Sequence, residues 1–236
     1  MEVKKGDLKL ILPFRGLISG SSGAGKTSFI LRFLENRTEI CQENFQKVIY
    51  CCSMYSEHNL TEKDKEVYQS LRKAVPYIEF YSTVPDLEEL SENKSIHTLL
   101  ILEDMIQEIV SSEKFSKLYT RISSHSNISV ITTSQNYFEQ GKHSQTIIRN
   151  QTFYVIFQSK GDNQTLSLIS SRMFTTSKHF LQKCFGWLNK MGVAGYKKYL
   201  FINVNPSTEL PQNFPMVQTN MFKESPFFSP VYFDEK

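Results

Sequence analysis

One eight-residue stretch near the N-terminus constrains the fold and chemistry of this chain more than any other feature. Residues 20–27 read Gly-Ser-Ser-Gly-Ala-Gly-Lys-Thr and match the phosphate-loop pattern G-x-x-x-x-G-K-[ST] at every defined position. In such a loop the glycines let backbone N–H groups surround phosphate oxygens, and the next helix directs its positive end at the same anion. The sequence therefore predicts a nucleoside triphosphate site made of Gly20, Ser21, Ser22, Gly23, Ala24, Gly25, Lys26 and Thr27.

The residues on either side of this loop favour a true phosphate loop over a Gly/Ser loop that only resembles one. Residues 14–19 are typical of a buried strand, and Phe29, Ile30, Phe33 and Leu34 follow at helical spacing. Strand, glycine loop and helix thus occur in the required order. Lys26 is expected to reach the β- and γ-phosphates, and the Thr27 hydroxyl to hold Mg²⁺.

An apolar run that ends in two acids predicts the second part of the site. Residues 98–102 are apolar after Thr98 and lead into Glu103 and Asp104, which indicates a strand buried on both faces of a parallel sheet. Open α/β sheets bind ligands at the carboxyl ends of their strands, so the acids are expected beside the phosphate loop. We assign Glu103 to Mg²⁺ and Asp104 to the attacking water by position, although the usual order is Asp then Glu. The alternative is a strand that simply emerges into solvent.

A further β-branched run, residues 127–136, ends in small polar side chains. Such a strand is expected in the ATPase branch whose sheet inserts an additional strand between the phosphate-loop strand and the acidic strand. Gln135 at its end is then placed to hydrogen-bond the γ-phosphate or the attacking water. The alternative is a turn residue that caps the strand.

The fold class predicted from these segments is α/β: a three-layer P-loop NTPase sandwich with a mainly parallel sheet of the additional-strand type. Residues 1–204 are expected to form the ATPase domain, and residues 205–236 an extended C-terminal arm rich in Pro and Phe. Further strands are predicted at 47–52, 77–81, 151–158 and 199–204, and helices at 57–73, 85–90, 113–122, 163–172 and 176–190.

Net charge, cysteine spacing and the N-terminal composition place a few limits on the partners, metal sites and location of the protein. The net charge is +3, which neither demands nor excludes a nucleic-acid partner. The four cysteines lack C-x-x-C spacing, so we expect small core residues of a reduced compartment rather than zinc ligands or disulfides. The charged N-terminus has no long apolar segment behind it, so no secretory signal or membrane span is expected.

Four segments together resemble one family. The phosphate loop, residues 48–53 (Val-Ile-Tyr-Cys-Cys-Ser), residues 99–104 (Leu-Leu-Ile-Leu-Glu-Asp) and above all residues 125–138 (His-Ser-Asn-Ile-Ser-Val-Ile-Thr-Thr-Ser-Gln-Asn-Tyr-Phe) are similar to the packaging ATPases of Maverick/Polinton elements and adintoviruses. These proteins are related to poxvirus packaging ATPases and belong to the FtsK/HerA branch. The similarity runs in order from about residue 13 to residue 174.

The resemblance implies an ATP- and Mg²⁺-dependent motor that pumps double-stranded DNA into a preformed capsid. It further implies a homo-oligomeric ring of five or six subunits, contact with a capsid portal or vertex, no membrane, and action inside the host cell, in the nucleus or cytoplasm or with the virion. The family commonly has two Asp residues where this chain has Glu103 and Asp104, and Arg where it has Gln145. Arg121 and Arg149 are the candidates for an arginine that completes a neighbour's active site, against a surface salt-bridge role for each.

DNA contact is expected in the later part of the chain, where basic and aromatic residues mix. The basic residues there are Lys178, His179, Lys183, Lys190, Lys197 and Lys198. Contacts to phosphates alone give sequence-independent binding that weakens with salt. The alternative is a solvated basic helix face.

Two other function classes stay open at this point. One is a nucleotide or small-molecule kinase, which shares the phosphate loop but needs an arginine-bearing lid; the arginines after the acids are widely separated. The other is a ring subunit that binds nucleotide without turning it over. A GTPase is disfavoured, because residues 189–192 (Asn-Lys-Met-Gly) fail the Asn-Lys-x-Asp motif at its last position.

Overall fold

The computed structural model describes residues 9–56, 60–158, 163–174, 178–190, 198–204, 216–218 and 221–222. Its centre is an eight-stranded sheet with the order β3-β2-β4-β5-β1-β6-β7-β8. The strands are β1 (Arg15–Ser19), β2 (Lys47–Cys52), β3 (Ile78–Tyr81), β4 (Thr98–Glu103), β5 (Ile128–Ser134), β6 (Phe153–Phe157), β7 (Tyr199–Asn203) and β8 (Met216–Gln218). The six strands from β3 to β6 in that order run parallel, whereas β7 and β8 pair antiparallel at the edge.

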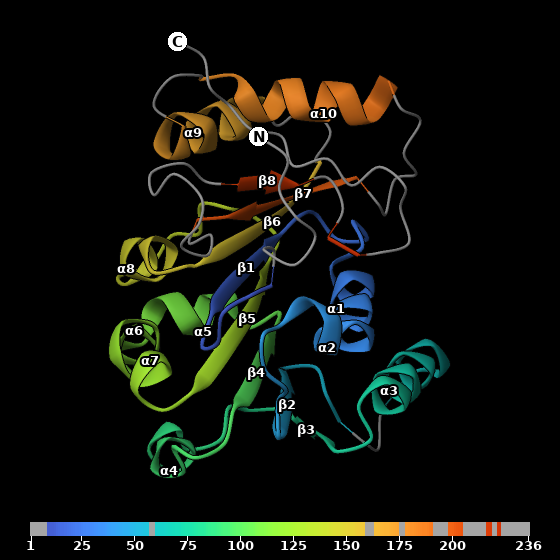
Figure 1. The fold of residues 1–236 in the computed structure, drawn as a ribbon, viewed down its shortest axis with the longest axis vertical. Helices are drawn as coiled ribbons and strands as arrows, with labels where there is room; N and C mark the ends of the chain where they lie inside the picture. The colour runs from blue at the N-terminus through green and yellow to red at the C-terminus, as the bar shows by residue number, and fades with distance from the viewer. Residues whose placement is uncertain are drawn as a thin grey trace.

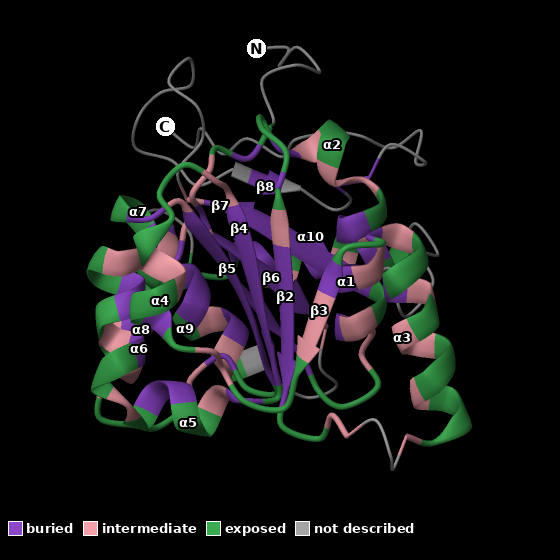
Figure 2. Cartoon of the chain, turned by 90° about the horizontal axis from the view of Figure 1, so that it is seen from below, coloured by how far each residue is buried: buried purple, intermediate pink, exposed green. Residues whose placement is uncertain are grey.

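Helices cover both faces of the sheet and make three layers (Figures 1 and 2). The helices are α1 (Lys26–Glu35), α2 (Arg37–Ile40), α3 (Glu62–Ala74), α4 (Leu87–Glu92), α5 (Ile106–Ser111), α6 (Glu113–Lys117), the π-helical turn η1 (Leu118–Ile122), α7 (Ser123–His125), α8 (Ser144–Arg149), α9 (Asn163–Met173) and α10 (Phe180–Lys190). Apolar side chains of α1 and α3 pack on one face, together with Ile18 and Tyr50. Those of α5, α6, α9 and α10 pack on the other face, which includes Leu17 and Leu100. The three-layer α/β prediction is confirmed.

Strand β5 lies between the phosphate-loop strand β1 and the acidic strand β4. Leu17 of β1 pairs with Thr132 of β5, and Leu100 of β4 pairs with Val130 of β5. Every residue of β4 and β5 is buried, as expected for central strands of a parallel sheet. The additional strand is therefore present where it was predicted, and the carboxyl ends of all three strands meet at one edge.

The structure departs from the predicted elements mainly in short segments. The helix predicted over 113–122 is divided into α6 and η1 and continues beyond that range as α7, and α5, α8 and β8 were not predicted. Helices α5 and α8 have six residues each, too few to display a helical repeat. Helix α3 begins later than expected, because Thr61 and Asp64 form a capping box there.

Two described pieces of the C-terminal region contact the domain. Strand β8 extends the sheet beside β7, and Phe222 is fully buried against Phe29 at 5.3 Å between ring centroids. The rest of the expected arm, residues 205–215, 219–220 and 223–236, lies outside the described residues. All four cysteines are buried and unpaired, as predicted for core residues. No helix in the described ranges is both long and apolar enough to span a bilayer.

Candidate functional site

The phosphate loop connects β1 to α1 at the carboxyl edge of the sheet. Gly23 and Gly25 have φ angles of 74° and 108°, which fall in the left-handed region that side chains other than glycine's rarely adopt. The pattern's glycine at position 25 is therefore required by the backbone conformation. Helix α1 begins directly after it at Lys26, so its first N–H groups face the loop.

Lys26 lies inside the loop rather than in solvent. Its Nζ donates to the carbonyl oxygens of Gly20 at 2.7 Å and Ser21 at 3.2 Å. Burial lowers the pKa of Lys26, and the charges of Asp104 and Glu103 oppose that shift. The ammonium thus lies between the loop and the two acids, where phosphate oxygens can replace the carbonyl oxygens as its partners.

Glu103 and Thr27 are brought into direct contact, although 76 positions separate them in the chain. Thr27 Oγ1 donates to Glu103 Oε1 at 2.6 Å, and the hydroxyl of Tyr50 donates to Glu103 Oε2. Burial raises the pKa of Glu103, and the hydrogen bonds from Thr27 and Tyr50 offset part of the increase. Burial also raises the pKa of Tyr50, so its hydroxyl keeps the proton that it donates.

Sequence reasoning missed Tyr50. It is an aromatic residue in a buried strand, and only the adjacency of β2 and β4 places its hydroxyl against Glu103. The register pairs Cys52, two residues further on, with Glu103 itself. Nothing in the sequence near Tyr50 signals this contact, because strand order is not written in the local pattern.

The Thr27 hydroxyl and the Glu103 carboxylate fit Mg²⁺. Both are hard oxygen donors, and Mg²⁺ in nucleotide sites is held by one or two protein oxygens together with waters and substrate phosphates. No group of three or more His, Cys, Asp or Glu side chains gathers in the described part of the chain as a cage for a metal ion. A two-oxygen site completed by phosphates needs no such group.

Asp104 has a different environment from its neighbour. It is exposed, its φ is 53°, and its N–H donates to Thr133 Oγ1 of β5 at 3.1 Å. Asp is one of the few residues that tolerate the left-handed region. The turn directs the chain away from β4 directly after Glu103, so one acid is buried at the loop and the other faces solvent at the same edge.

The loop after β5 carries Gln135 and is fixed by a carboxylate. Glu139 Oε1 accepts from Ser134 Oγ at 2.8 Å and from the Asn136 N–H at 3.3 Å, and its Oε2 accepts from Gln107 Nε2 of α5 at 3.0 Å. Glu139 therefore links the loop of Gln135 to the helix that follows the two acids. Sequence reasoning missed Glu139 too, since its link to Gln107 joins two segments 32 positions apart in the chain.

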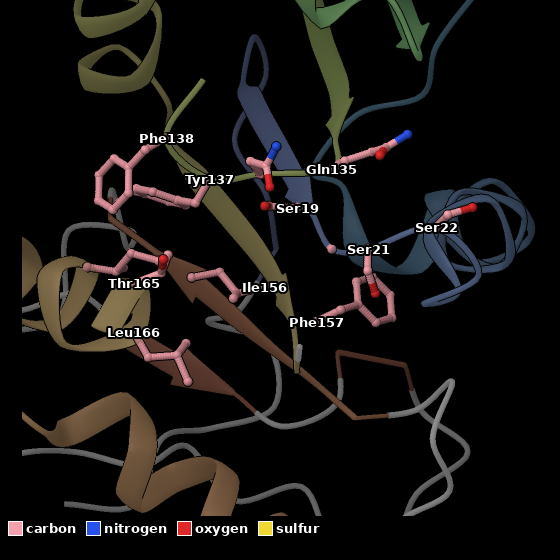
Figure 3. Close-up of a pocket in the computed structure, with 13 residues that line it drawn as sticks. Ser19, Ser21, Ser22, Gln135, Tyr137, Phe138, Ile156, Phe157, Thr165 and Leu166 are labelled. Carbon is pink, nitrogen blue, oxygen red and sulfur yellow. The ribbon is translucent and has the colours of Figure 1, made fainter. Parts of the chain in front are cut away.

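A cavity of about 330 Å³ opens beside the phosphate loop (Figure 3). Its lining consists of loop residues, the segment after β5, and apolar residues of β6 and α9. They are Ser19, Gly20, Ser21, Ser22, Gln135, Asn136, Tyr137, Phe138, Ile156, Phe157, Thr165, Leu166 and Ile169. The side chain of Gln135 extends away from Tyr137 and Phe138 (Figure 3). Gln135 is exposed and lies next to the loop.

The remaining candidates lie apart from this cavity. Arg121 lies in η1 and Arg149 ends α8; both are exposed, neither lines the cavity, and neither forms an ion pair with another described residue. Lys178, His179, Lys183 and Lys190 are exposed on or just before α10. Lys198 is half-buried, and Lys197 lies outside the described residues.

The fold and the phosphate loop define a P-loop NTPase of the class whose sheet has an additional strand between the loop strand and the acidic strand. A family model described as Poxvirus A32 protein matches residues 4–205. Because this match spans most of the chain, the protein belongs to the poxvirus A32 protein family.

Solved structures agree on the fold. The DNA-packaging ATPase B204 from Sulfolobus turreted icosahedral virus is 13% identical, with a TM-score of 0.54 over 94% of this chain and 99% of that one. The genome packaging NTPase B204 from Sulfolobus turreted icosahedral virus 2, in complex with ATP-gammaS, is also 13% identical, with a TM-score of 0.52 over 87% of this chain and 96% of that one. A comparison with curated proteins found no significant match.

Proposed function

We propose that this protein hydrolyses ATP to move double-stranded DNA into a capsid. The contact between Thr27 and Glu103, next to the buried ammonium of Lys26, is the observation that carries this proposal. It gathers at one sheet edge the groups that phosphoryl transfer needs: a cation for the phosphates, a hydroxyl and a carboxylate for Mg²⁺, and a second carboxylate near by. B204, the DNA-packaging ATPase to which the fold is similar, supports the choice of motor over kinase.

Each residue has a separate role in the proposed reaction. The backbone N–H groups of residues 20–27 and Lys26 bind the phosphates of ATP, and Thr27 and Glu103 hold Mg²⁺, which supplies positive charge to the phosphate oxygens when bound. Asp104, exposed at the same edge, accepts the proton of the attacking water or orients it. Gln135 hydrogen-bonds the γ-phosphate or that water, and Glu139 fixes the loop that carries it.

Turnover measurements test this assignment. The purified protein is expected to hydrolyse ATP faster in the presence of duplex DNA, and Lys26→Ala and Asp104→Asn are expected to abolish turnover. Lys117→Ala, a matched change at an exposed lysine of α6, should leave the rate unchanged. Turnover that is indifferent to DNA and survives Lys26→Ala would contradict the motor. Nucleotide binding without turnover would favour a structural ring subunit, and phosphate transfer to an added nucleoside monophosphate would favour a kinase.

We further propose that the active site is completed in a homo-oligomeric ring of five or six subunits. Arg121 and Arg149 are exposed and unpaired among described residues, so either is free to reach a neighbour's nucleotide. Such an arginine contributes a factor of about 10³ to 10⁵ in rate. Subunits with Lys26→Ala keep their arginines, and subunits with Arg121→Ala or Arg149→Ala keep their loops. Mixing the two should restore activity that neither has alone, and no recovery with either variant would exclude both arginines.

The type of packaging ATPase, its capsid contact, its location in the cell and its division into domains are parts of the same proposal. The four segments named from the sequence support a packaging ATPase of the Maverick/Polinton and adintovirus type, which docks on a capsid portal or vertex. It would act inside the host cell, in the nucleus or cytoplasm, or with the virion. We also propose that residues 1–204 form the ATPase domain and residues 205–236 an arm; β8 and Phe222 contact the domain from within that arm.

A further inference from the structure

Charge is unevenly distributed along this chain. Residues 163–208 contain six Lys and Arg and no Asp or Glu, out of totals of 27 and 24. The remainder therefore has 21 basic and 24 acidic residues, and the overall net charge of +3 conceals a basic segment within an acidic protein. The described part of this segment includes α9 and α10, which pack against each other and lie along one side of the molecule (Figure 1).

Helix α10 has one buried face and one basic face. Phe180, Leu181, Cys184, Phe185 and Leu188 are buried in the core. The exposed residues Lys183, Trp187 and Lys190 follow at spacings of four and three, which places them on one stripe of the helix surface, and exposed His179 precedes the helix, where its carbonyl accepts from the Lys183 N–H. Trp187 exposes 41% of its surface, although most exposed positions near it are polar. We call these four residues the α10 stripe.

A glycine leaves the middle of the α10 stripe open. Gly186 is three residues after Lys183 and four before Lys190, and a Cβ built on it meets no atom within 4 Å apart from its chain neighbours and the adjacent backbone of its own helix. Glycine in a helix interior costs about 0.5–1 kcal/mol relative to alanine. Packing therefore does not explain this glycine, whereas close approach of a ligand to the helix backbone would.

We propose that the α10 stripe is the surface that contacts the sugar-phosphate backbone of duplex DNA, an inference that rests on the proposed function. Lys183 and Lys190 lie about 10 Å apart along the helix axis, at 1.5 Å per residue, which matches about three base-pair steps. The ammonium groups neutralise phosphates, and the indole N–H of Trp187 donates to a phosphate or sugar oxygen. Such contacts read no bases, as a motor that moves along any sequence requires. An acidic surface of a second subunit is the competing occupant.

The tryptophan of the stripe gives a direct readout. Trp187 is the only tryptophan in the chain, so its fluorescence reports on this surface alone. Titrating the full protein with a random-sequence duplex should change the Trp187 emission until saturation, and added salt should reverse the change. An emission that stays constant while DNA raises the ATPase rate would overturn the proposal.

Charge removal provides the second test. Lys183→Ala combined with Lys190→Ala removes two phosphate contacts. The negative slope of the logarithm of the DNA association constant against log salt should therefore decrease in magnitude by about 1.8, and binding should weaken on the order of 50-fold at 0.1 M salt. Lys65→Ala combined with Lys73→Ala removes the same charge from the exposed side of α3, on the opposite face of the sheet, and should change neither quantity. Both double variants should keep the basal ATPase rate without DNA.

The outcomes separate this inference from the proposed function. If DNA does not stimulate the wild-type ATPase at all, the motor proposal fails first. If DNA stimulates the wild type and the Lys183/Lys190 variant binds DNA with the wild-type affinity and salt slope, only the assignment of the α10 stripe as the DNA-contacting surface is wrong. If that variant instead loses its oligomeric state while each remaining oligomer binds DNA normally, the stripe contacts a second subunit, which also overturns the proposal.

Discussion

The hydroxyl of Tyr50 offers the sharpest single-atom test of the site. Tyr50→Phe removes the donor to Glu103 Oε2 but keeps the ring, which packs at 5.6 Å from Phe80 and 6.3 Å from Tyr68 between centroids. The substitution therefore creates no cavity. Its effect is confined to the carboxylate, which is left with Thr27 as its side-chain donor among the described residues.

The expected magnitude follows from the two protonation states of Glu103. A hydrogen bond to a charged group contributes about 1.5–3 kcal/mol and one to a neutral group about 0.5–1.5 kcal/mol. The ionised form therefore loses about 1–1.5 kcal/mol more than the protonated form, which raises the pKa of Glu103 by about one unit. At neutral pH the free energy of unfolding should fall by about 1.5–3 kcal/mol.

The assay is the pH dependence of kcat/KM for ATP hydrolysis, combined with urea unfolding at neutral pH. The acid limb of kcat/KM reports groups of the free enzyme, so Tyr50→Phe should move it to higher pH by about one unit. Tyr77→Phe is the control, because the Tyr77 hydroxyl donates at 2.7 Å to the neutral carbonyl of Phe45 away from the site. An acid limb that stays in place in Tyr50→Phe would refute the assignment of Glu103 as the ionised carboxylate of the site.

Three further predictions concern Glu103, Glu139 and Gly186. Because burial raises the pKa of Glu103 above its ordinary 4.5, the folded state binds this proton more tightly, so the wild type loses stability as pH rises from about 4.5 through the raised pKa. Glu103→Gln lacks this loss, so its unfolding free energy relative to the wild type should increase over the same window while hydrolysis is abolished; a difference independent of pH would contradict the shift. Glu139→Ala should lower kcat by up to about 100-fold with little change in KM, since it releases the loop of Gln135, and Glu139→Gln should recover much of it; equal losses in both variants would exclude positioning through the acceptor oxygen. Gly186→Ala should raise the unfolding free energy in urea by about 0.5–1 kcal/mol, because the new methyl group meets open space; a decrease would show that the position is constrained after all.

Local patterns predicted much of the fold. The loop at 20–27, the apolar run before Glu103 and the β-branched run before Gln135 each encode their own conformation, and each was found in place. The insertion of β5 between β1 and β4 was also predicted, but from the class of protein rather than from periodicity. The short helices α5 and α8 were not predicted, because six residues are too few to show the 3.6-residue hydrophobic repeat of a helix.

The contacts that refine the site could not be predicted. Tyr50 reaches Glu103 only because β2 and β4 are neighbours, and Glu139 reaches Gln107 only because α5 packs beside the loop after β5. Such contacts depend on strand order and side-chain direction, which the local sequence does not encode. The position of Glu103 beside the phosphate loop, in contrast, followed from the rule that ligands bind at the carboxyl edge of a parallel sheet.

Displacement of a third strand from duplex DNA tests the central claim most directly. A labelled triplex-forming oligonucleotide is annealed to one end of a duplex, and its release is followed after the protein and ATP are added. We predict release that requires hydrolysable ATP, proceeds with the wild type and with Lys117→Ala, and is absent with Lys26→Ala. ATP hydrolysis without release of the third strand on any duplex, by protein that binds the same DNA, would contradict a motor that moves along DNA.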